Sequence, residues 1–336
     1  MDHRGREDRT IGVFYEHLEW FEAMFAEFDR RGVAYERLLA NRHGFDPGER
    51  ESPYALLFNR MSPSAFARGH GHAIHYTLDY LAHLESIGAN VLNGYRPYTY
   101  EFSKARQLGL LARLDVRCPR TRVINHVAQT VVAAQQLSYP LVVKPNIGGS
   151  GAGIRKFDDD AELRAAAEAG EIDLGLDGTA LVQEYHTPRE GSIVRVEVLD
   201  GRFLYAIKLH LQSPDSFNLC PADYCQVPQA GLGVAAQGAA DGVSGRGVPV
   251  EGFTPTAEAI ATVQRITAAA GIEVGGVEYL VSERDGERYY YDINALSNFV
   301  ADAPNVVGFD PVPLLVDFVM VRAGLLQTAT LATVTG

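Results

Sequence analysis

The sequence contains few cysteines, no long apolar run and no excess of basic residues. Three cysteines (Cys118, Cys220 and Cys225) do not make a disulfide framework, which favours a reduced, cytoplasmic protein. No apolar run approaches the ~18 residues that span a bilayer, and segment 1–10 is too polar for a signal peptide. The formal net charge of −12 argues against a nucleic-acid partner, because phosphate contacts need clustered Lys and Arg. We therefore expect neither a membrane nor a nucleic acid as partner.

The pattern of apolar residues predicts an α/β chain with more than one domain. Its 336 residues, 46% hydrophobic and 21% charged, are enough for two or three globular domains. In the first ~100 residues, strand and helix patterns alternate, which predicts a small parallel sheet covered by helices. Later, Asp200-Gly201 and Asp285-Gly286 are strong hairpin signals. Segment 226–252, rich in Gly and Ala, is predicted to be a mobile loop or lid, with disorder as the alternative.

A glycine-rich loop follows the apolar strand Leu141–Lys144, with glycines at 148, 149, 151 and 153. Glycine lets backbone N–H groups approach an anion closely. A Walker A loop is excluded because Gly-Lys-Ser/Thr is absent. A dinucleotide fingerprint is disfavoured because the next helix begins only near Asp160. The pattern predicts a strand–loop–strand flap over phosphates, and a plain glycine hairpin is the alternative. Lys144 favours the flap, since a buried lysine needs an anionic partner.

A pattern typical of a metal-binding site lies near residue 290. Asp292 and Asn294 are two apart on a predicted strand, so both project from one face. If the hairpin before them has the three-residue loop 284–286, then Glu278 opposes Asp292, whereas a two-residue turn would separate their faces. Two carboxylates and an amide oxygen suit Mg²⁺ bound with substrate phosphates. An edge strand with exposed polar residues is the alternative.

The hairpin at Asp200-Gly201 is predicted to have one polar face. A two-residue turn would place the polar residues Arg195, Glu197 and Lys208 together. The other face would then carry Val194, Val196 and Val198 with Ile207, Tyr205 and Phe203. Two cations on one face could stabilise transferring phosphoryl oxygens, and a solvated face with ordinary ion pairs is the alternative.

Two further groups are weighed and set aside. His70, His72 and His75 have spacings that could hold a transition metal, but no cysteine or acidic residue completes the set nearby. We expect them instead to contact substrate or to bond at a helix start. Cys220 and Cys225 are expected to be packed or incidental, with a role in loop shape as the alternative.

The order of these motifs resembles the ATP-grasp superfamily, most closely its RimK-like and glutathione-synthetase-like carboxylate–amine ligases. The likeness runs from about Tyr54 to Asn294. It comprises Leu57–Arg60, Gly88–Asn93, Ser103-Lys104, Pro119–Thr121, Val143–Pro145 with the glycine flap, Leu181–Tyr185, the polar hairpin and Asp292–Asn294. The resemblance implies an α/β (α+β) ATP-grasp fold with a Rossmann-like N-terminal substrate domain over 1–103. A small lid subdomain would cover 104–185, and a C-terminal subdomain with the metal site and the 226–252 loop would cover 186–336.

The function that this resemblance implies is an ATP-dependent ligase. It would join a small-molecule carboxylate to an amine (an amino acid or peptide) through an acyl-phosphate, releasing ADP and phosphate. A homo-oligomer is expected. The alternatives are a small-molecule kinase on the same fold and a nucleotide-binding regulatory protein without turnover.

The site residues follow from the same resemblance. The residues implied to bind ATP are Lys104, Lys144, Gly149, Ser150, Gly151, Gln183, Glu184, Tyr185, His186 and Glu190. Mg²⁺ would be held by Glu278, Asp292 and Asn294. Arg195 and Lys208 would stabilise the reacting groups, and Arg60 would contact the carboxylate substrate. The chain departs from the family pattern at Asp292, where Glu is usual, and at Ile193, where Asp is usual.

Overall fold

The first sheet is parallel and is built from the first part of the chain, as the alternating pattern predicts. The computed structural model describes residues 10–149, 151–211, 217 and 249–327. Strands follow the order β2-β1-β3-β4. These are β1 (Ile11–Tyr15), β2 (Tyr35–Leu39), β3 (Leu56–Arg60) and β4 (Val91–Leu92), with α1 (Glu22–Arg31), α2 (Gly71–Ser86), α3 (Tyr95–Glu101) and 3-10 turns η2 (Leu18–Phe21), η3 (Ala40–Arg42) and η4 (Pro63–Arg68).

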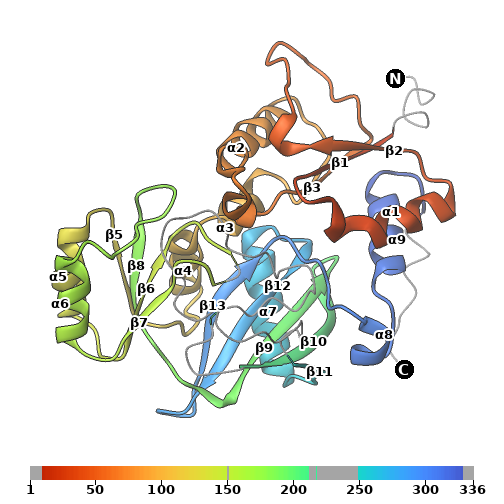
Figure 1. The fold of residues 1–336 in the computed structure, drawn as a ribbon. Helices are drawn as coiled ribbons and strands as arrows, with labels where there is room; N and C mark the ends of the chain where they lie inside the picture. Colours follow the sequence, from red (N-terminus) through yellow and green to blue (C-terminus); the bar gives the residue numbers. More distant parts are fainter. Residues whose placement is uncertain (1–9, 150, 212–216, 218–248, 328–336) are drawn as a thin grey trace, which may run out of the picture.

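The two faces of this sheet have different partners. Along β1, Val13 packs toward α1 whereas Phe14 packs toward α2, as a strand's period of two requires. The C-terminal helix α9 (Val312–Arg322) lies beside α1 (Figure 1). Arg31 of α1 forms an ion pair with Asp317 of α9 and donates to the carbonyl of Pro313. Segments at opposite ends of the sequence therefore share one apolar core.

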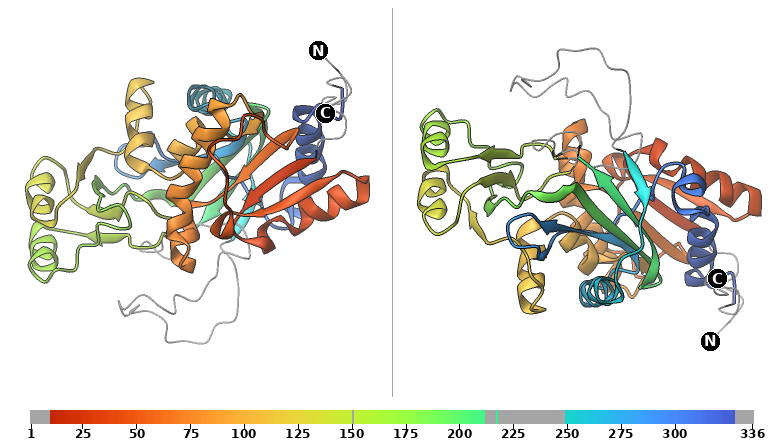
Figure 2. Two further views of the ribbon diagram at one scale, coloured as in Figure 1. Left: turned by 90° about the horizontal axis from the view of Figure 1, so that it is seen from above. Right: turned by 90° about the horizontal axis from the view of Figure 1, so that it is seen from below.

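A second, antiparallel sheet has the order β5-β8-β6-β7 and its own apolar core. It projects away from the rest of the molecule, with both of its helices on one face (Figures 1 and 2). Its elements are β5 (Thr121–Ile124), η5 (Val127–Gln129), α5 (Thr130–Ala134), β6 (Leu141–Pro145), β7 (Arg155–Phe157), α6 (Asp160–Glu168) and β8 (Ala180–Glu184), and α4 (Lys104–Arg113) precedes them.

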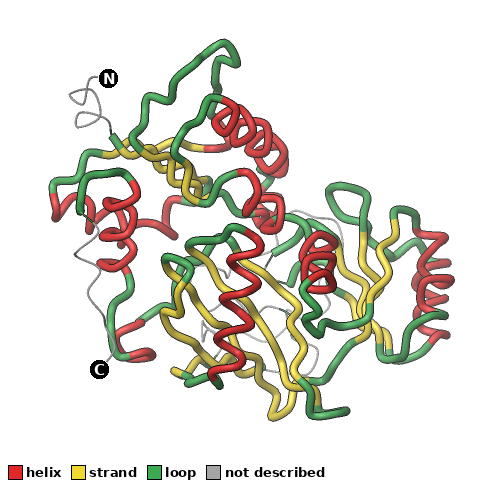
Figure 3. Tube along the Cα trace, turned by 180° about the vertical axis from the view of Figure 1, so that it is seen from behind, coloured by secondary structure: helices red, strands yellow, loops and turns green. Residues whose placement is uncertain are grey.

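The third sheet is antiparallel, in the order β11-β10-β9-β12-β13, and α7 covers one of its faces (Figure 3). The elements are β9 (Pro188–Leu199), β10 (Arg202–His210), β11 (Val250–Gly252), α7 (Ala257–Ala270), β12 (Val274–Ser282), β13 (Arg288–Asn294) and α8 (Ala303–Val307). Within the described residues, no helix is both long and apolar enough to cross a bilayer. Residues 226–248 of the predicted loop, with Cys220 and Cys225, lie outside the described part. The end of that loop was assigned wrongly, because residues 250–252 pair with β10 at the sheet edge.

The register of β9 and β10 was predicted wrongly beyond Phe203. The pair Val198–Phe203 fits a two-residue turn, but a bulge between Phe203 and Tyr205 shifts all later pairs by one residue. Arg195 therefore opposes Ile207, and Lys208 opposes Val194 on the other face. The prediction failed because both faces of this sheet are apolar, so alternation alone does not fix the register.

The predicted pairing of Glu278 with Asp292 is confirmed, although the loop is longer than expected. Next to the turn Val281 opposes Arg288, which leaves more than the three predicted residues in the loop. An irregularity between Glu278 and Tyr279 then shifts the register by one residue and brings Glu278 opposite Asp292. The bulge thus compensates for the longer turn, and the acidic pair shares one face.

Close packing of β12 against β13 makes a stability prediction at Gly275. A Cβ there would collide with the carbonyl of Asn294 and lie 2.7 Å from Cγ2 of Ile272. We expect Gly275→Ala to lower the free energy of unfolding by ~1–3 kcal/mol, as overpacking usually does. Denaturant titration measures this, with Gly44→Ala as control because nothing lies within 4 Å of a Cβ at that position. An unchanged midpoint for Gly275→Ala would contradict the predicted collision.

Candidate active site

One cavity is lined by residues from all three parts of the chain. Trp20 and Ser64 come from the N-terminal part, Lys144 and the glycine loop from the second sheet, and Arg195 and Glu278 from the third. Among the predicted site residues that line it are Lys104, Lys144, Gly149, Gly151, Gln183, Glu184, Tyr185, His186, Arg195, Glu278, Asp292 and Asn294. Ser150 lies outside the described residues. The structure therefore brings most of the predicted set together.

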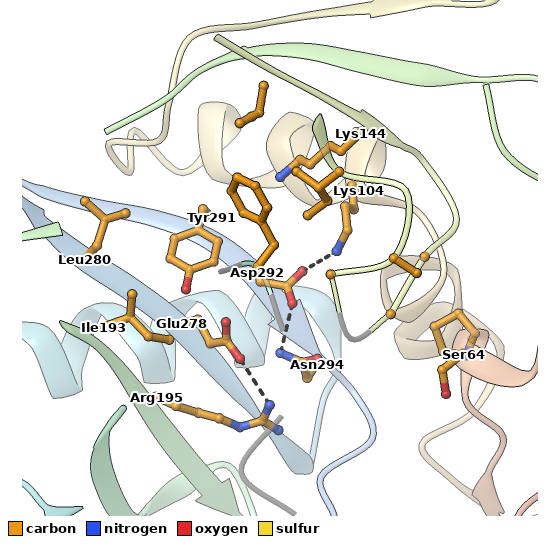
Figure 4. A pocket seen from close by; sticks show the side chains of 18 of the residues that line it. Ser64, Lys104, Lys144, Ile193, Arg195, Glu278, Leu280, Tyr291, Asp292 and Asn294 are labelled. Atoms are coloured by element: carbon orange, nitrogen blue, oxygen red, sulfur yellow. Dashed lines mark hydrogen bonds and ion pairs between the residues drawn. The ribbon is translucent and has the colours of Figure 1, made fainter. Parts of the chain in front are cut away.

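A row of charged side chains crosses the third sheet on the cavity side. Arg195, Glu278 and Asp292 are directly opposed on β9, β12 and β13, so they share a face. Nη1 of Arg195 donates to Oε1 of Glu278 at 3.2 Å (Figure 4). Asn294 lies two residues beyond Asp292 and donates to its Oδ2 at 3.5 Å. Two carboxylates and one amide side chain thus share this face, and their oxygens are of the kind that suits a hard divalent cation.

Two lysines face this row from the other side of the cavity (Figure 4). Lys104 begins α4, where Ser103 caps the helix, and its Nζ lies 2.8 Å from Oδ1 of Asp292. Burial alone would lower the pKa of Lys104, but Asp292 outweighs it and the net pKa shift is upward. Burial and the charge of Lys104 lower the pKa of Lys144 to about 7. Because the cavity itself disfavours the charged form of Lys144, an anionic ligand that restores this charge should bind well.

The carboxyl groups of the cavity are perturbed as well. Burial and the neighbouring Asp292 raise the pKa of Glu278 to about 7, and the same two causes raise the pKa of Glu101 to about 7. Asp292 is also penalised by burial, but Lys104 more than compensates and lowers its pKa. Glu101 accepts hydrogen bonds from the backbone N–H groups of Ala295 and Leu296, so it fixes the segment after β13.

The glycine loop joins two paired strands, as predicted. β6 and β7 are antiparallel, and α6 begins only at Asp160, so no helix follows the loop directly. A Cβ on Gly149 would lie 2.8 Å from Cβ of Ser64. The loop is therefore packed against the N-terminal part, and only glycine allows this approach. Strand–loop–strand geometry disfavours the dinucleotide interpretation.

The end of β8 forms another wall of the cavity. Oε1 of Glu184 accepts from the backbone N–H of Ser138 at 2.8 Å and from Arg120 at 3.2 Å. His186 stacks on Tyr289 with ring centroids 3.8 Å apart, and its Nδ1 lies 3.2 Å from the Ser282 hydroxyl. These contacts hold the backbone of residues 184–186 rigid beside the cavity.

Three predicted residues do not line the cavity. Lys208 pairs with Glu190 at 2.9 Å, so these two side chains neutralise each other elsewhere. Lys208 was misplaced by the register error on β10. Arg60 is buried but does not line the cavity. It donates to the carbonyl of Ser297 and packs against the rings of Phe21 and Phe58. Its contacts position the wall segment around Asn298 rather than open into the cavity.

Three other lining residues, Glu101, Glu197 and Tyr291, were not predicted as site residues. Glu197 was placed on the polar face with Arg195 but was not chosen as a site residue. Glu101 ends a helix and Tyr291 belongs to a tyrosine run that reads as strand packing. Of the predicted histidine cluster, His70 contacts Glu16 and Asn41. Among the described residues, no group of three His, Cys, Asp or Glu side chains could hold a metal.

Comparison with known proteins agrees with this geometry. Residues 102–216 match the model of the RimK-like ATP-grasp domain. D-alanine–D-alanine ligase from Haemophilus influenzae (strain PittEE) is 32% identical over 130 residues, which cover 35% of this chain and 41% of that protein. The chain thus matches less than half the length of this curated relative.

Solved structures match over nearly the whole chain. The ATP-grasp ligase PsnB with its minimal precursor has a TM-score of 0.62 and 18% identity, covering 94% of this chain and 100% of PsnB. D-alanine–D-alanine ligase from Bacillus anthracis complexed with ATP has a TM-score of 0.64 and 16% identity, covering 94% and 97%. At these identities the likeness shows the fold. This chain carries a RimK-like ATP-grasp domain within an ATP-grasp fold.

Proposed function

We propose that the chain is an ATP-dependent carboxylate–amine ligase that works through an acyl-phosphate. The observation that supports this most directly is the row Arg195, Glu278 and Asp292 facing two lysines in a cavity beside a glycine loop. Positive groups for phosphates, oxygen donors for a divalent cation and a cation for a developing oxyanion are the parts that this chemistry needs. The similarity to proteins that are themselves ligases adds support.

Each group of residues has a task in this proposal. Lys104 and Lys144 bind the phosphates of ATP, the loop 148–153 covers them, and residues 183–186 contact the adenine. Glu278, Asp292 and Asn294 fit Mg²⁺, which supplies charge neutralisation at the phosphates when bound. Because Lys208 and Glu190 pair away from the cavity, we assign oxyanion stabilisation to Arg195 alone and no ATP contact to Glu190. Homo-oligomer formation and a cytoplasmic location stay predictions.

Two bonds are exchanged in the reaction. An oxygen of the substrate carboxylate attacks the γ-phosphorus of ATP, the bond to the β-phosphate breaks, and ADP leaves. The amine nitrogen then attacks the acyl carbon, the bond to the phosphate oxygen breaks, and the phosphate leaves with the proton that the amine loses. Arg195 stabilises the negative oxygen of the tetrahedral species, and the walls of the cavity exclude water that would hydrolyse the acyl-phosphate.

Product analysis tests this function against its rivals. Purified protein with Mg-ATP is incubated with a panel of carboxylates and amines, and ADP, free phosphate and amide are quantified. A ligase releases ADP and phosphate in equal amounts with each amide formed. ADP with a phosphorylated product and no free phosphate would instead show a kinase. Nucleotide binding without turnover on any panel member would favour the regulatory alternative.

Nucleotide binding should be coupled to proton uptake at Lys144. Its pKa of about 7 in the free protein lies below the ordinary 10.5, so the charged form is disfavoured until an anion binds. At pH 8 a group of that pKa is only ~10% protonated, and bound phosphates restore its charge, so uptake of ~0.9 proton is expected. Calorimetry of ADP binding in buffers of different ionisation enthalpy measures the uptake. Lys144→Arg, which stays charged at pH 8, should show almost none, and equal uptake by both proteins would contradict the assignment.

The same shift fixes the sign of a stability effect. Because the folded-state pKa is lowered, protonation of Lys144 costs stability in the unliganded protein. That cost is full below pH ~7 and fades as the pH rises toward ~10.5, the value in an unfolded chain. Bound nucleotide removes the cost, so its stabilising effect should weaken with rising pH across this window.

A further inference from the structure

Glu197 lies at the centre of β9 and its carboxylate lines the cavity. It is 1% exposed and is opposed by Tyr205 on β10 and by Gly276 on β12. Asn294 of β13 opposes Gly276 from the other side. Glu197 therefore lies on the same face of the sheet as Asn294 and as Arg195, two residues away on β9. The proposed ligase reaction as set out above gives this carboxylate no task.

Only one oxygen of this carboxylate has a hydrogen-bond partner. Oε1 accepts from Nε of Arg195 at 2.6 Å. Oε2 is buried, and among the described residues nothing donates to it. A buried ionised oxygen without a donor is costly, so the fold retains this arrangement at the expense of stability. An unpaired acceptor on a residue that lines a cavity suits a ligand that brings its own N–H groups.

The charges around Glu197 indicate which kind of hydrogen-bond donor fits beside its unpaired oxygen Oε2. Arg195 already places a unit positive charge beside it and bridges to Glu278. A second positive group, Arg60, is near enough for Glu197 to raise the pKa that burial lowers to about 9. A divalent cation at Oε2 would be repelled by both guanidinium groups. A monovalent ammonium offers N–H donors and half that charge, so it fits better.

The neighbouring strand leaves room for the carboxylate. A Cβ on Gly276 would lie 2.8 Å from Oε2 and 3.0 Å from the carboxyl carbon of Glu197. The side chain of Glu197 therefore extends over the backbone of β12, which only a glycine permits. Any larger residue at this position would displace the free oxygen from its place in the cavity.

We propose that Oε2 of Glu197 binds the ammonium group of the amine substrate. The proposal rests on the ligase function and narrows its substrate class to amines that are protonated at neutral pH. Glu197 attracts the ammonium form into the cavity and places its nitrogen beside Arg195. The ammonium gives one proton to Oε2 of Glu197 before its lone pair attacks the acyl carbon. Arg195 thus has two partners. Its Nε holds Glu197, which binds the amine substrate, and its Nη1 contacts Glu278, one of the proposed metal ligands.

The test compares a charged and an uncharged nucleophile in Glu197→Gln. Hydroxylamine is largely uncharged at neutral pH and traps acyl-phosphates as hydroxamates, so it reports activation of the carboxylate without the ammonium site. With Mg-ATP and a carboxylate panel, Glu197→Gln should lose far less of its hydroxamate formation than of its amide formation from the protonated amine. Its KM for the protonated amine should rise ~10- to 150-fold, the range for a lost bond to a charged group. Glu251→Gln, an exposed position of the same sheet, is the matched control and should change neither value.

A second variant keeps the charge and changes only the space. Gly276→Ala should raise the KM for the protonated amine while leaving hydroxamate formation and Mg-ADP affinity in place. Melting temperature and Mg-ADP affinity, measured for both variants, show whether each is folded and holds nucleotide.

The remaining outcomes separate the proposals. Equal loss of both nucleophile reactions in folded Glu197→Gln would make the residue structural, and lost Mg-ADP affinity would make it a metal ligand. Either result would overturn the ammonium site. If the wild type itself forms no hydroxamate with any carboxylate, the ligase function fails rather than the role of Glu197.

Discussion

Arg195→Ala should both destabilise the fold and abolish most turnover. The guanidinium is the partner of two buried carboxylates, and although burial lowers its pKa, Glu197 and Glu278 shift it upward overall. Removing one member of a buried ionic network leaves the others uncompensated, which costs ~3–5 kcal/mol of unfolding free energy. Loss of an oxyanion-stabilising group costs ~10²–10³-fold in kcat. Denaturant titration and steady-state phosphate release measure the two effects.

Two companion variants separate charge from geometry. Arg195→Lys keeps the positive charge but cannot contact both carboxylates in the same plane, so we expect intermediate stability and low turnover. Arg195→Ala with Glu197→Gln removes one of the stranded charges and should recover part of the stability with no gain in kcat. If Arg195→Ala unfolds at the wild-type midpoint, the carboxylates do not depend on this side chain and the assignment of the row is wrong.

Lys144→Met should change binding and stability in opposite directions. Losing a desolvated contact to phosphate should weaken ADP binding by ~100-fold. In the free protein, however, the substitution replaces a buried amine of lowered pKa with an apolar side chain of similar length, so the unliganded melting temperature should not fall. Calorimetry and thermal unfolding with and without Mg-ADP measure both quantities.

Lys208→Met is the matched control, because the same change is made at a lysine that pairs with Glu190 outside the cavity lining. It should leave ADP affinity nearly unchanged. A large loss in Lys208→Met, or none in Lys144→Met, would place the phosphates elsewhere. The comparison also decides directly whether Lys208 keeps the stabilising role that its sequence position suggested.

The metal-type residues show what local sequence can predict. Asp292 and Asn294 could be placed on one face because a strand has a fixed period of two. Their pairing with Glu278 was also correct, although the longer turn and the irregularity beside Tyr279 could not be foreseen. The longer turn shifts the register in one direction and the irregularity shifts it back, so the predicted pair was kept. The glycine loop and Lys144 were found because few other arrangements put glycines and a buried lysine together.

The failures arise where a side chain depends on parts of the chain far away in sequence. Strand β10 carries apolar residues on both faces, so alternation could not reveal its bulge, which moves Lys208 away from Arg195. Arg60 was expected by resemblance to contact the carboxylate substrate, but its environment depends on Ser297, far along the chain. Glu197 was passed over because its open oxygen depends on Gly276 across the sheet, which no local pattern encodes.

The position of α9 bears on how the chain is made. Val13 and Phe25, near the start of the sequence, share their core with Leu315 and Phe318 near its end. During synthesis the first sheet leaves the ribosome long before the helix that completes it, and its strands must wait with one apolar face incompletely covered. Nascent chains of this protein therefore expose apolar surface for most of their translation. The N-terminal part is synthesised first but completes its folding last.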